Sequence, residues 1–487
     1  MSMLAREEQG ARDPLSPASL DAVSRWLKSR SARQFPRRHV SGVTCEVDAV
    51  RPGDLFVALQ GCGEEVARLA MGRGAVAVVA EESCGVESEL PVIRVPDAIR
   101  ALGWLSAEIL NRETTSLLTC GITGGFGKSS TIALLQAALT SGGIAATVVG
   151  GSLERAPAPH RFQQHLRNAW ERSSRVCLVE APTVDVARRR FEGTRFDVGV
   201  LTNALSRHLE VHGSEEERYE SLLDVFRNIK TKGVAVLPGE DDFSEVIAAE
   251  CRCRVLTYGV SGRYDVRGQI RRMDTKGTEL FVTTPLGEGT LRLSLPGELH
   301  ARNALAALAT SLALSAPQQE ALEGIASVGV LKGCLQALAL PLPFSVYLDG
   351  ADDAQSLRAT LRSLGPLARR RVILVGAMAQ CGDGARPAAM ARVMEDLADQ
   401  VIVTTTRSTL GHPMTPIRDL MRGFTRPTDV MLLPDRQAAV EAALRSARAG
   451  DIVLVMSDGD GESDARMIRD WCLRGLKEAA FQGEEAS

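Results

Sequence analysis

Short apolar runs separated by amphipathic stretches set the pattern of this chain from residue 43 onward. Over residues 43–112 these runs flank segments with helical periodicity, which predicts a small α/β unit. Its expected strands are 55–59, 76–79 and 92–95, and its expected helices are 64–73 and 99–112. Residues 1–42 are polar and rich in arginine, with one helical stretch at 20–29, and we predict a partly ordered lead-in there.

The apolar runs become nearly continuous in residues 113–338 and lie between helical or loop segments. Strands of that kind are typical of a parallel sheet that is buried on both faces. We therefore predict a central, doubly wound parallel sheet. Its expected strands begin at Leu118 and continue at 146–149, 176–179, 198–201, 234–237 and 255–258. Residues 264–295 alternate as antiparallel strands do, and 303–315 read as an alanine-rich helix.

A proline-containing stretch at 340–343 precedes the last segment, and residues 339–487 repeat the parallel pattern. We predict a Rossmann-like domain there. Its expected strands are 345–348, 372–375, 401–404 and 452–456, with helices ending near 364 and 398, around 417 and at 438–447. The length supports several cores, so the sequence predicts an α/β protein of three domains with boundaries near 42, 112 and 338.

Composition describes an ordinary globular protein. Hydrophobic residues make up 45%, charged residues 24%, and the net charge is −3, which indicates neither a nucleic-acid nor a membrane partner. Apolar runs such as 74–80 are shorter than the ~18 residues that cross a bilayer, and acidic residues replace a signal-peptide core near the N-terminus. We therefore expect a cytoplasmic protein without membrane insertion. The 10 cysteines form no C-x-x-C pair, so reduced thiols are expected and a structural zinc site is not.

Residues 118–136, L-T-C-G-I-T-G-G-F-G-K-S-S-T-I-A-L-L-Q, pass from an apolar strand through a glycine turn into a helix. Glycines at such a turn let backbone N–H groups surround an anion, a lysine adds positive charge, and a hydroxyl can bind magnesium. We predict a phosphate site (P-loop) with ATP as the expected ligand and Mg²⁺ as a possible cofactor. Its residues are Gly124, Gly125, Gly127, Lys128, Ser129 and Ser130. The alternative is a purely structural glycine turn.

Four segments together resemble the Mur ligases, and most closely the UDP-N-acetylmuramoyl-tripeptide synthetase type, MurE. They are the glycine loop, R-F-D-V-G-V-L-T-N at 195–203 followed by H-L-E-V-H-G at 208–213, L-P-G-E-L-H-A-R-N-A-L-A-A-L at 295–308, and V-R-P-G-D-L-F-V-A-L-Q-G at 50–61. The resemblance covers about residues 43–462. It implies a three-domain ligase in which ATP activates a carboxylate as an acyl phosphate, which an amino acid then attacks.

By this resemblance Lys128 and His208 are catalytic residues, and Ser129, Glu180 and His208 are magnesium ligands. The metal site also departs from the family. The lysine whose carbamate binds a second magnesium aligns with Leu223, and Arg207 replaces the aspartate before the histidine. Because leucine cannot be carbamylated, we expect a two-metal arrangement to be much weaker here.

The resemblance adds Asn303, Asp349 and Arg386 to the nucleotide-binding residues. Asn303 matches the second asparagine of an adenine-side element, and His300 occupies the position of the first. An asparagine at a helix start is equally well explained as an N-cap. Asp349 and Arg386 are also explained as solvated charges at strand ends.

The motifs that face substrate change as well. The amino-acid-selecting D-N-P-R reads T-R-S-T at 406–409, and G-K-G-H-E reads S-D-G-D-G at 457–461. In the first domain D-S-R reads E-V-D at 46–48, so a UDP-sugar would meet the carboxylates of Glu46 and Asp48, which repel its diphosphate. A UDP-muramoyl peptide is therefore a doubtful ligand.

Segments that build the scaffold persist while contacts to metal, nucleotide-sugar and amino acid change, a pattern expected where folding is retained and chemistry is not. We therefore expect a MurE-like pseudoenzyme that keeps its P-loop, has lost most of the ligase site, and serves as a nucleotide sensor or scaffold for protein partners in peptidoglycan synthesis in the cell wall. One alternative is an active ATP-dependent carboxylate–amine ligase with an altered substrate and a selecting pocket rebuilt from Arg407, Ser408 and Thr409. Another is an interaction protein that uses no nucleotide.

Overall fold

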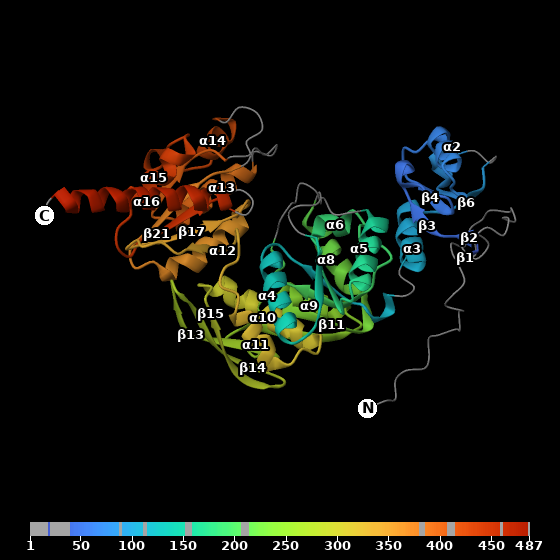
Figure 1. Cartoon of the computed structure of the whole chain (residues 1–487), viewed down its shortest axis with the longest axis horizontal. Coiled ribbons are helices and arrows are strands. Elements are labelled where there is room, and N and C mark those ends of the chain that lie inside the picture. The colour runs from blue at the N-terminus through green and yellow to red at the C-terminus, as the bar shows by residue number, and fades with distance from the viewer. Residues whose placement is uncertain are drawn as a thin grey trace. The chain divides into compact units, whose positions relative to one another are not determined.

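The computed structural model of the chain describes residues 18–19, 39–86, 90–110, 114–150, 158–205, 214–378, 385–406, 414–457 and 461–485. The described residues form three large sheets and one short antiparallel pair, β1 (Ala18–Ser19) with β2 (His39–Val40) (Figure 1). Contacts between residues divide the chain into two units. The first holds the described residues of Met1–Thr119, Leu153–Cys177 and Asp185–Phe196, and the second holds the others. The domain boundaries near 42, 112 and 338 stay a prediction.

The first unit is built on a four-stranded sheet in which all neighbours are parallel. Its strands are β3 (Gly42–Thr44), β4 (Asp54–Ala58), β5 (Ala77–Ala80) and β6 (Val92–Arg94). Its helices are α2 (Glu64–Gly72), α3 (Ala98–Leu110) and α5 (Pro159–Glu171), with short 3-10 turns η1 (Val47–Ala49), η2 (Glu82–Cys84) and η3 (Thr114–Ser116). Every residue of β4 and β5 is buried, which explains their continuous apolar runs.

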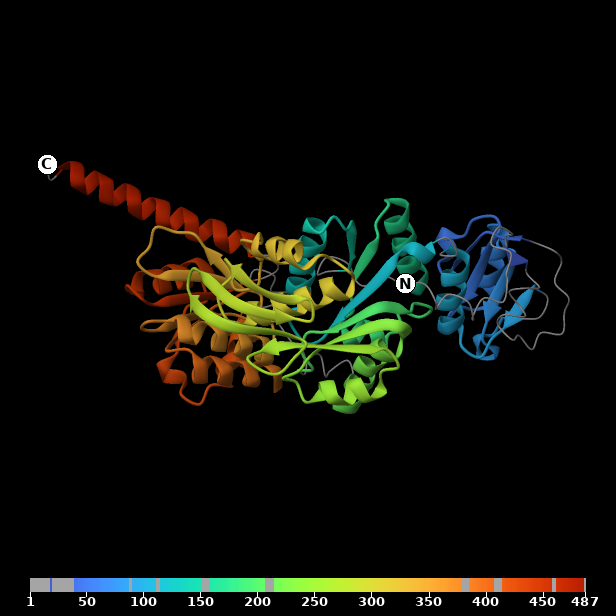
Figure 2. The ribbon, with the colours of Figure 1, turned by 90° about the horizontal axis from the view of Figure 1, so that it is seen from below.

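A nine-stranded sheet with the order β15-β14-β13-β12-β11-β10-β7-β9-β8 lies mostly in the second unit. Its strands are β7 (Leu118–Thr123), β8 (Ala146–Val149), β9 (Val176–Glu180), β10 (Phe196–Leu201), β11 (Ile229–Pro238), β12 (Arg254–Val260), β13 (Val266–Asp274), β14 (Gly277–Thr284) and β15 (Gly287–Leu293). Strand β7 is parallel to β10, whereas β13, β14 and β15 are antiparallel neighbours (Figure 2). The predicted antiparallel strands are thereby confirmed.

In the described residues, six helices accompany this sheet. They are α4 (Lys128–Ser141), α6 (Thr183–Ala187), α8 (Glu215–Arg227), α9 (Phe243–Glu250), α10 (Glu298–Ala313) and α11 (Gln318–Ala326). The alanine-rich helix begins at Glu298, five residues before the predicted start at Asn303. The same unit also holds a six-stranded sheet with the order β16-β17-β21-β18-β19-β20, in which β16 alone pairs antiparallel.

The strands of that six-stranded sheet are β16 (Gln336–Leu338), β17 (Ser345–Asp349), β18 (Val372–Gly376), β19 (Gln400–Val403), β20 (Met431–Leu432) and β21 (Ile452–Met456). Its helices are α12 (Ala354–Leu364), α13 (Ala385–Leu397), α14 (Met414–Met421), α15 (Arg436–Ser446) and α16 (Glu462–Glu485), with 3-10 turns η4 (Gly365–Leu367) and η5 (Pro427–Asp429). One apolar core joins α12, α13 and α14 to the sheet, and another joins α15 and α16 to it. The sheet is therefore covered on both faces, as the parallel pattern predicts.

Ligands of open α/β sheets bind beyond the carboxyl ends of the strands. In the nine-stranded sheet the glycine loop follows β7, and the segment that leads to α8 follows the parallel neighbour β10. Both segments therefore leave the same edge of the sheet.

None of the helices in the described residues combines the length and the apolar character needed to cross a membrane.

Candidate functional site

The glycine loop joins β7 to α4 and contains two glycines with left-handed backbone. Gly124 has a φ of 128° and Gly127 a φ of 82°, and residues with a side chain are strained in this region. A side-chain carbon on Gly124 would lie 2.3 Å from Oγ1 of Thr202, and one on Gly125 would lie 2.7 Å from the carbonyl oxygen of Leu205. The loop therefore requires glycine both for its backbone and for its packing.

Lys128 is the first residue of α4 and is only 8% exposed. Its Nζ donates hydrogen bonds to the carbonyl oxygens of Gly124, at 2.9 Å, and Gly125, at 3.2 Å. The ammonium thus lies over the loop at the N-terminus of a 14-residue helix. The helix dipole and the lysine both place positive charge there, which favours a bound anion.

Ser129 and Glu180 meet beside the loop, although 51 residues separate them. Ser129 Oγ lies 3.3 Å from Oε1 and 3.2 Å from Oε2 of Glu180, which ends β9. A hydroxyl and a carboxylate are the oxygen ligands that Mg²⁺ prefers, so this pair fits the predicted metal site. The third predicted ligand, His208, lies outside the described residues. Its predicted catalytic role therefore stays a prediction.

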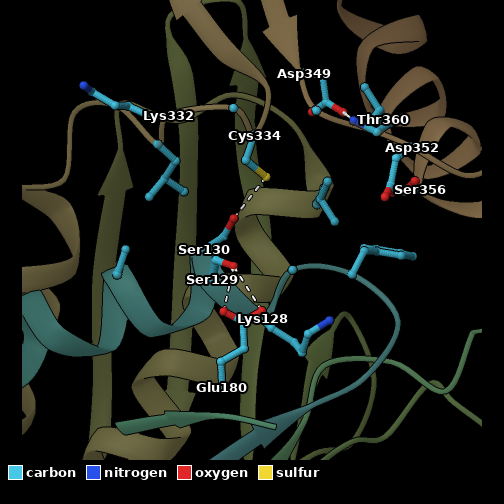
Figure 3. A pocket seen from close by; sticks show the side chains of 18 residues that line it. Lys128, Ser129, Ser130, Glu180, Lys332, Cys334, Asp349, Asp352, Ser356 and Thr360 are labelled. Carbon is cyan, nitrogen blue, oxygen red and sulfur yellow. Dashed lines mark hydrogen bonds between the residues drawn. The ribbon is translucent and has the colours of Figure 1, made fainter. Parts of the chain in front are cut away.

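A pocket of about 490 Å³ opens at the loop (Figure 3). This volume is typical of small-ligand sites. The loop and α4 contribute Gly127, Lys128, Ser129 and Ser130 to its lining, and β9 contributes Glu180. The opposite wall comes from residues 331–334 and from the end of β17, where Asp349 lies. The pocket therefore combines predicted phosphate, metal and nucleotide residues.

Cys334 lines the same pocket, and the motif analysis did not identify it. The Oγ atom of Ser130 lies 3.0 Å from Cys334 Sγ, although 204 residues separate the two (Figure 3). Burial raises the pKa of the Cys334 thiol to about 12, so the sulfur stays protonated and can interact only weakly with an anion. Since no short-range motif connects these residues, spacing along the chain could not have revealed the contact.

Asp349 is buried, with 4% of its surface exposed, so the interpretation as a solvated charge is wrong. Its Oδ2 accepts from the N–H of Leu335 at 2.8 Å, and its Oδ1 accepts from the N–H of Ala351 at 2.9 Å and from Thr360 at 3.1 Å. Burial nevertheless raises the pKa of Asp349 to about 6. The carboxylate thus fixes the segment at Leu335 against β17, at the wall of the pocket.

Asn303 lies in the second turn of α10 and is 5% exposed. The N-cap of that helix is Gly297, so the alternative interpretation of Asn303 as an N-cap is wrong. A side-chain carbon on Gly127 would lie 2.6 Å from Asn303 Oδ1, which places the amide directly beside the glycine loop. His300 is fully buried, and burial lowers its pKa to about 4, so its ring is neutral near pH 7.

Arg386 does not line the pocket. Its Nη2 donates to the carbonyl oxygen of Asp352 at 2.7 Å, and Asp352 is a lining residue. Arg386 thus contacts the pocket wall through Asp352, and its role in nucleotide binding stays a prediction. The substituted motif residues Arg407, Ser408, Thr409 and Asp458 lie outside the described residues.

Leu223, the residue aligned with the carbamylated lysine, is 6% exposed on the buried face of α8. Leu222, Val225 and Phe226 are buried on the same helix. Leu223 therefore belongs to an apolar core contact and offers no ligand for a metal.

The carboxylates of the E-V-D segment in the first unit are paired with arginines. Arg161 of α5 donates to Glu46, and this bond holds the pKa of Glu46 below its ordinary value. Nε2 of His160 lies 3.5 Å from the same carboxylate. Nη1 of Arg73 lies 2.7 Å from Asp48 Oδ1. These ion pairs, which the sequence motif alone could not reveal, weaken the expected repulsion of a diphosphate. Since the Asp48 side chain is 88% exposed, its pair with Arg73 is weak, and the expectation that a UDP-muramoyl peptide is a doubtful ligand stays a prediction.

Comparison with known proteins identifies related families. Residues 122–311 match the Mur ligase middle domain, and residues 336–459 match the Mur ligase glutamate ligase domain. The chain is 30% identical to the UDP-N-acetylmuramyl-tripeptide synthetase of a Roseiflexus species over 456 residues, which cover 86% of this chain and 90% of that protein.

Solved structures agree on the fold. A UDP-N-acetylmuramoyl-L-alanyl-D-glutamate–2,6-diaminopimelate ligase matches with a TM-score of 0.66 at 20% identity, over 90% of this chain and 93% of that one. MurF ligase from Thermotoga maritima, solved in complex with ADP, matches with a TM-score of 0.63 at 18% identity, over 90% of this chain and 99% of that one. The predicted three-domain α/β architecture, with its parallel sheets, is confirmed by these matches.

Proposed function

The chain belongs to the Mur ligase family, and from that premise we propose that it binds ATP at the glycine loop but has lost most of the ligase chemistry. The observation that carries the first half is the position of Lys128 over the loop, with Ser129, Ser130 and Glu180 around one pocket. A phosphate in that pocket would meet a lysine, two hydroxyls and a helix N-terminus. Where Mg²⁺ is bound, Ser129 and Glu180 would hold it, and the ion would neutralise phosphate charge.

The second half of the proposal is supported by α8. An apolar residue, Leu223, packs into the core at the position aligned with the carbamylated lysine of the family. Removing groups that stabilise charge in a transition state commonly lowers rates by about 10²–10⁴-fold each. We therefore propose a MurE-like pseudoenzyme, a nucleotide sensor or scaffold for protein partners in peptidoglycan synthesis.

Calorimetric titration of ATP with Mg²⁺ into the full chain tests nucleotide binding. Charge-assisted hydrogen bonds contribute roughly 1.5–3 kcal/mol, so Lys128→Ala should weaken ATP binding by about 10–100-fold. Lys230→Ala is the matched control. Lys230 does not line the pocket, its side chain is 43% exposed, and its Nζ lies 2.8 Å from Oδ1 of Asp197, so its loss should change affinity by less than about threefold.

If wild type and Lys128→Ala both give no heat, and a fluorescent ATP analogue also gives no signal with either, the chain does not bind ATP and the proposed nucleotide site is wrong. The chain would then be an interaction protein. If both variants bind equally well, ATP occupies another place and the assignment to the loop fails.

A working ligase with an altered substrate is the second candidate, and the pairing of Glu46 and Asp48 with arginines favours it. Those ion pairs leave the first unit without unpaired carboxylates at the segment where a nucleotide-sugar is expected. ATP activation at Lys128 would then serve a carboxylate acceptor that differs from the usual one. Phosphate release that depends on an added acceptor would decide for this candidate.

A further inference from the structure

Arg218 is one of the largest fully buried side chains in the described part of the chain, at 2% exposure. It lies in the first turn of α8, a helix that Figure 1 labels. The sequence motifs did not single out this arginine. An arginine keeps its positive charge inside a protein, and removing that charge from water is unfavourable unless acceptors replace the water. The surroundings of Arg218 should therefore contain such acceptors.

They contain few. The Nη1 atom of Arg218 makes one long hydrogen bond, 3.4 Å, to the carbonyl oxygen of Leu205. The guanidinium carbon lies 4.2 Å from the centre of the Tyr219 ring, which in turn stacks on Phe243 at 4.3 Å. Within the described residues, Nε and Nη2 of Arg218 have no hydrogen-bond partner.

The two unpartnered nitrogens lie on one edge of the guanidinium. The guanidinium carbon lies over the Tyr219 ring, and a cation–π contact of this kind does not replace the hydrogen bonds of Nε and Nη2. Nε and Nη2 form a bidentate donor that matches two oxygens of a carboxylate or a phosphoryl group. In this same chain, Nε and Nη2 of Arg436 hold the two oxygens of Asp464 at 2.9 and 2.6 Å.

Nearby carboxylates do not neutralise Arg218. Glu215, Glu216 and Glu217 precede it on α8, and all three are exposed. Asp241 belongs to the segment beside Phe243, but its Oδ2 accepts from the N–H of Ala204 and its Oδ1 from the N–H of Phe243. The charge of Arg218 is therefore uncompensated by the described protein groups.

The position of Arg218 connects it to the glycine loop. The carbonyl oxygen of Leu205, which accepts from Arg218, also lies against Gly125. A side-chain carbon on Gly125 would be 2.7 Å from that oxygen, so only glycine fits there. The glycine loop and Leu205 follow parallel neighbours β7 and β10 at the carboxyl edge of one sheet. That edge is where ligands of such sheets bind.

We propose that Arg218 is the cationic centre of an oxyanion site that is distinct from the contacts of Lys128. Its ligand presents two oxygens side by side, from a carboxylate or from a phosphoryl group. Natural proteins retain unsatisfied buried groups of this kind chiefly at functional sites, and a bound anion would complete this one. The inference does not depend on nucleotide binding at the loop.

Thermal unfolding of the full chain in potassium chloride, potassium phosphate and potassium glutarate at matched ionic strength tests the site. Phosphate, glutarate or both should raise the melting temperature of wild type. They should do the same for Lys128→Ala, which removes phosphate contacts at the loop, and for Arg227→Met, a matched control on α8 whose arginine is exposed and paired with Glu220.

Arg218→Met should lose this response and, in chloride, should melt at or above the wild-type temperature, because an apolar side chain of similar length replaces an uncompensated charge. Arg218→Lys keeps the charge but not the bidentate donor, so its half-maximal anion concentration should rise at least tenfold, about 1.4 kcal/mol. The anion that acts through Arg218 identifies the ligand as phosphoryl or carboxylate.

The proposal is overturned if neither anion stabilises wild type, or if Arg218→Met or Arg218→Lys responds as wild type does. Failure of Arg218→Met to fold leaves the decision to Arg218→Lys. If ATP fails to bind wild type while the response through Arg218 persists, the proposed function falls and the oxyanion site stands.

Discussion

Among the described residues of the second unit two arginines are buried, and the protein surrounds them in opposite ways. Arg436, the first residue of α15, is 8% exposed and donates to both oxygens of Asp464, to the carbonyl of Thr405 at 3.0 Å and to the carbonyl of Met456 at 2.6 Å. Arg218 on α8 is 2% exposed, and its one hydrogen bond within the described ranges is a long one, 3.4 Å, to the carbonyl oxygen of Leu205. Burial is similar, but only Arg436 has its hydrogen bonds made.

The difference in hydrogen bonding separates a buried arginine that helps to hold the fold together from one that the fold does not pair. Arg436 ties the ends of β19 and β21 to the starts of α15 and α16, so its partners come from elements that the sheet requires. Arg218 shares α8 with Leu223, a buried apolar residue. In the part of the chain that the structure describes, Arg436 is thus satisfied by protein groups, whereas Arg218 keeps two nitrogens without a partner.

The largest expected effect comes from breaking the satisfied pair. Asp464→Ala should leave Arg436 as a second buried, unpaired guanidinium and lower the free energy of unfolding by about 3–5 kcal/mol. Denaturant unfolding followed by circular dichroism measures this loss. The double variant Arg436→Met/Asp464→Leu should recover most of it, since apolar groups of similar volume can replace a buried ion pair.

A loss below about 1 kcal/mol for Asp464→Ala would contradict the comparison. It would mean that Arg436 reaches water or other acceptors once its partner is gone.

The buried face of α8 provides the next test. Because Leu223 is an apolar core contact, Leu223→Ala should lower the free energy of unfolding by about 3 kcal/mol. Leu222→Ala, on the same helix and fully buried, gives the reference value. A near-neutral Leu223→Ala beside a costly Leu222→Ala would show that Leu223 faces a ligand site, which would weaken the pseudoenzyme proposal.

Asp349 is a buried carboxylate with three hydrogen-bond donors, and its behaviour depends on pH. Burial raises its pKa from 3.8 to about 6, so the folded state holds its proton more tightly than the unfolded state does. The stability that the neutral form contributes is fully present below about pH 4 and is lost as the pH rises through about 6.

The asparagine variant isolates this effect. The free energy of unfolding of Asp349→Asn minus that of wild type should be about 1–2 kcal/mol higher at about pH 7.5 than at about pH 5, because only wild type loses stability over this range. Urea unfolding of both proteins at the two pH values measures the difference. A difference that does not change with pH would show that the carboxylate is ionised in the folded state throughout this range.

The smallest effect is expected at the exposed ion pair of the first unit. The side chain of Arg161 is 55% exposed and that of Glu46 35%, so Arg161→Ala should change the free energy of unfolding by less than about 1 kcal/mol. Chemical unfolding at low and high salt provides the measurement. A loss comparable to that of Asp464→Ala would refute the view that burial sets the importance of each pair.

Sequence patterns predicted the scaffold because its causes are local. The apolar runs that became β4, β5, β18 and β21 are buried at every position, and the glycine loop requires glycine at Gly124 and Gly127 through backbone angles alone. Short or exposed strands such as β3 and β20 lack such a pattern and were not predicted.

The site was predictable only where a motif carries it. The Ser129–Glu180 pair followed from the family motifs, but Cys334 beside Ser130 and the arginine partners of Glu46 and Asp48 depend on contacts between distant segments. The burial of Asp349 likewise reflects packing of 331–335 against β17. Charge alone therefore gave the wrong expectation for Asp349 and did not reveal the arginine partners of Glu46 and Asp48, because partners and burial are properties of the folded chain.

The central claim is that this ligase fold binds ATP without joining an amino acid to a peptide, and one assay tests it most directly. Purified full chain is incubated with ATP, Mg²⁺, UDP-muramoyl peptides and a panel of amino acids, with the Roseiflexus synthetase as the positive control. The account predicts no phosphate release that depends on the acceptor and no new amide product. Acceptor-dependent phosphate release together with a peptide product, lost in Lys128→Ala, would contradict it.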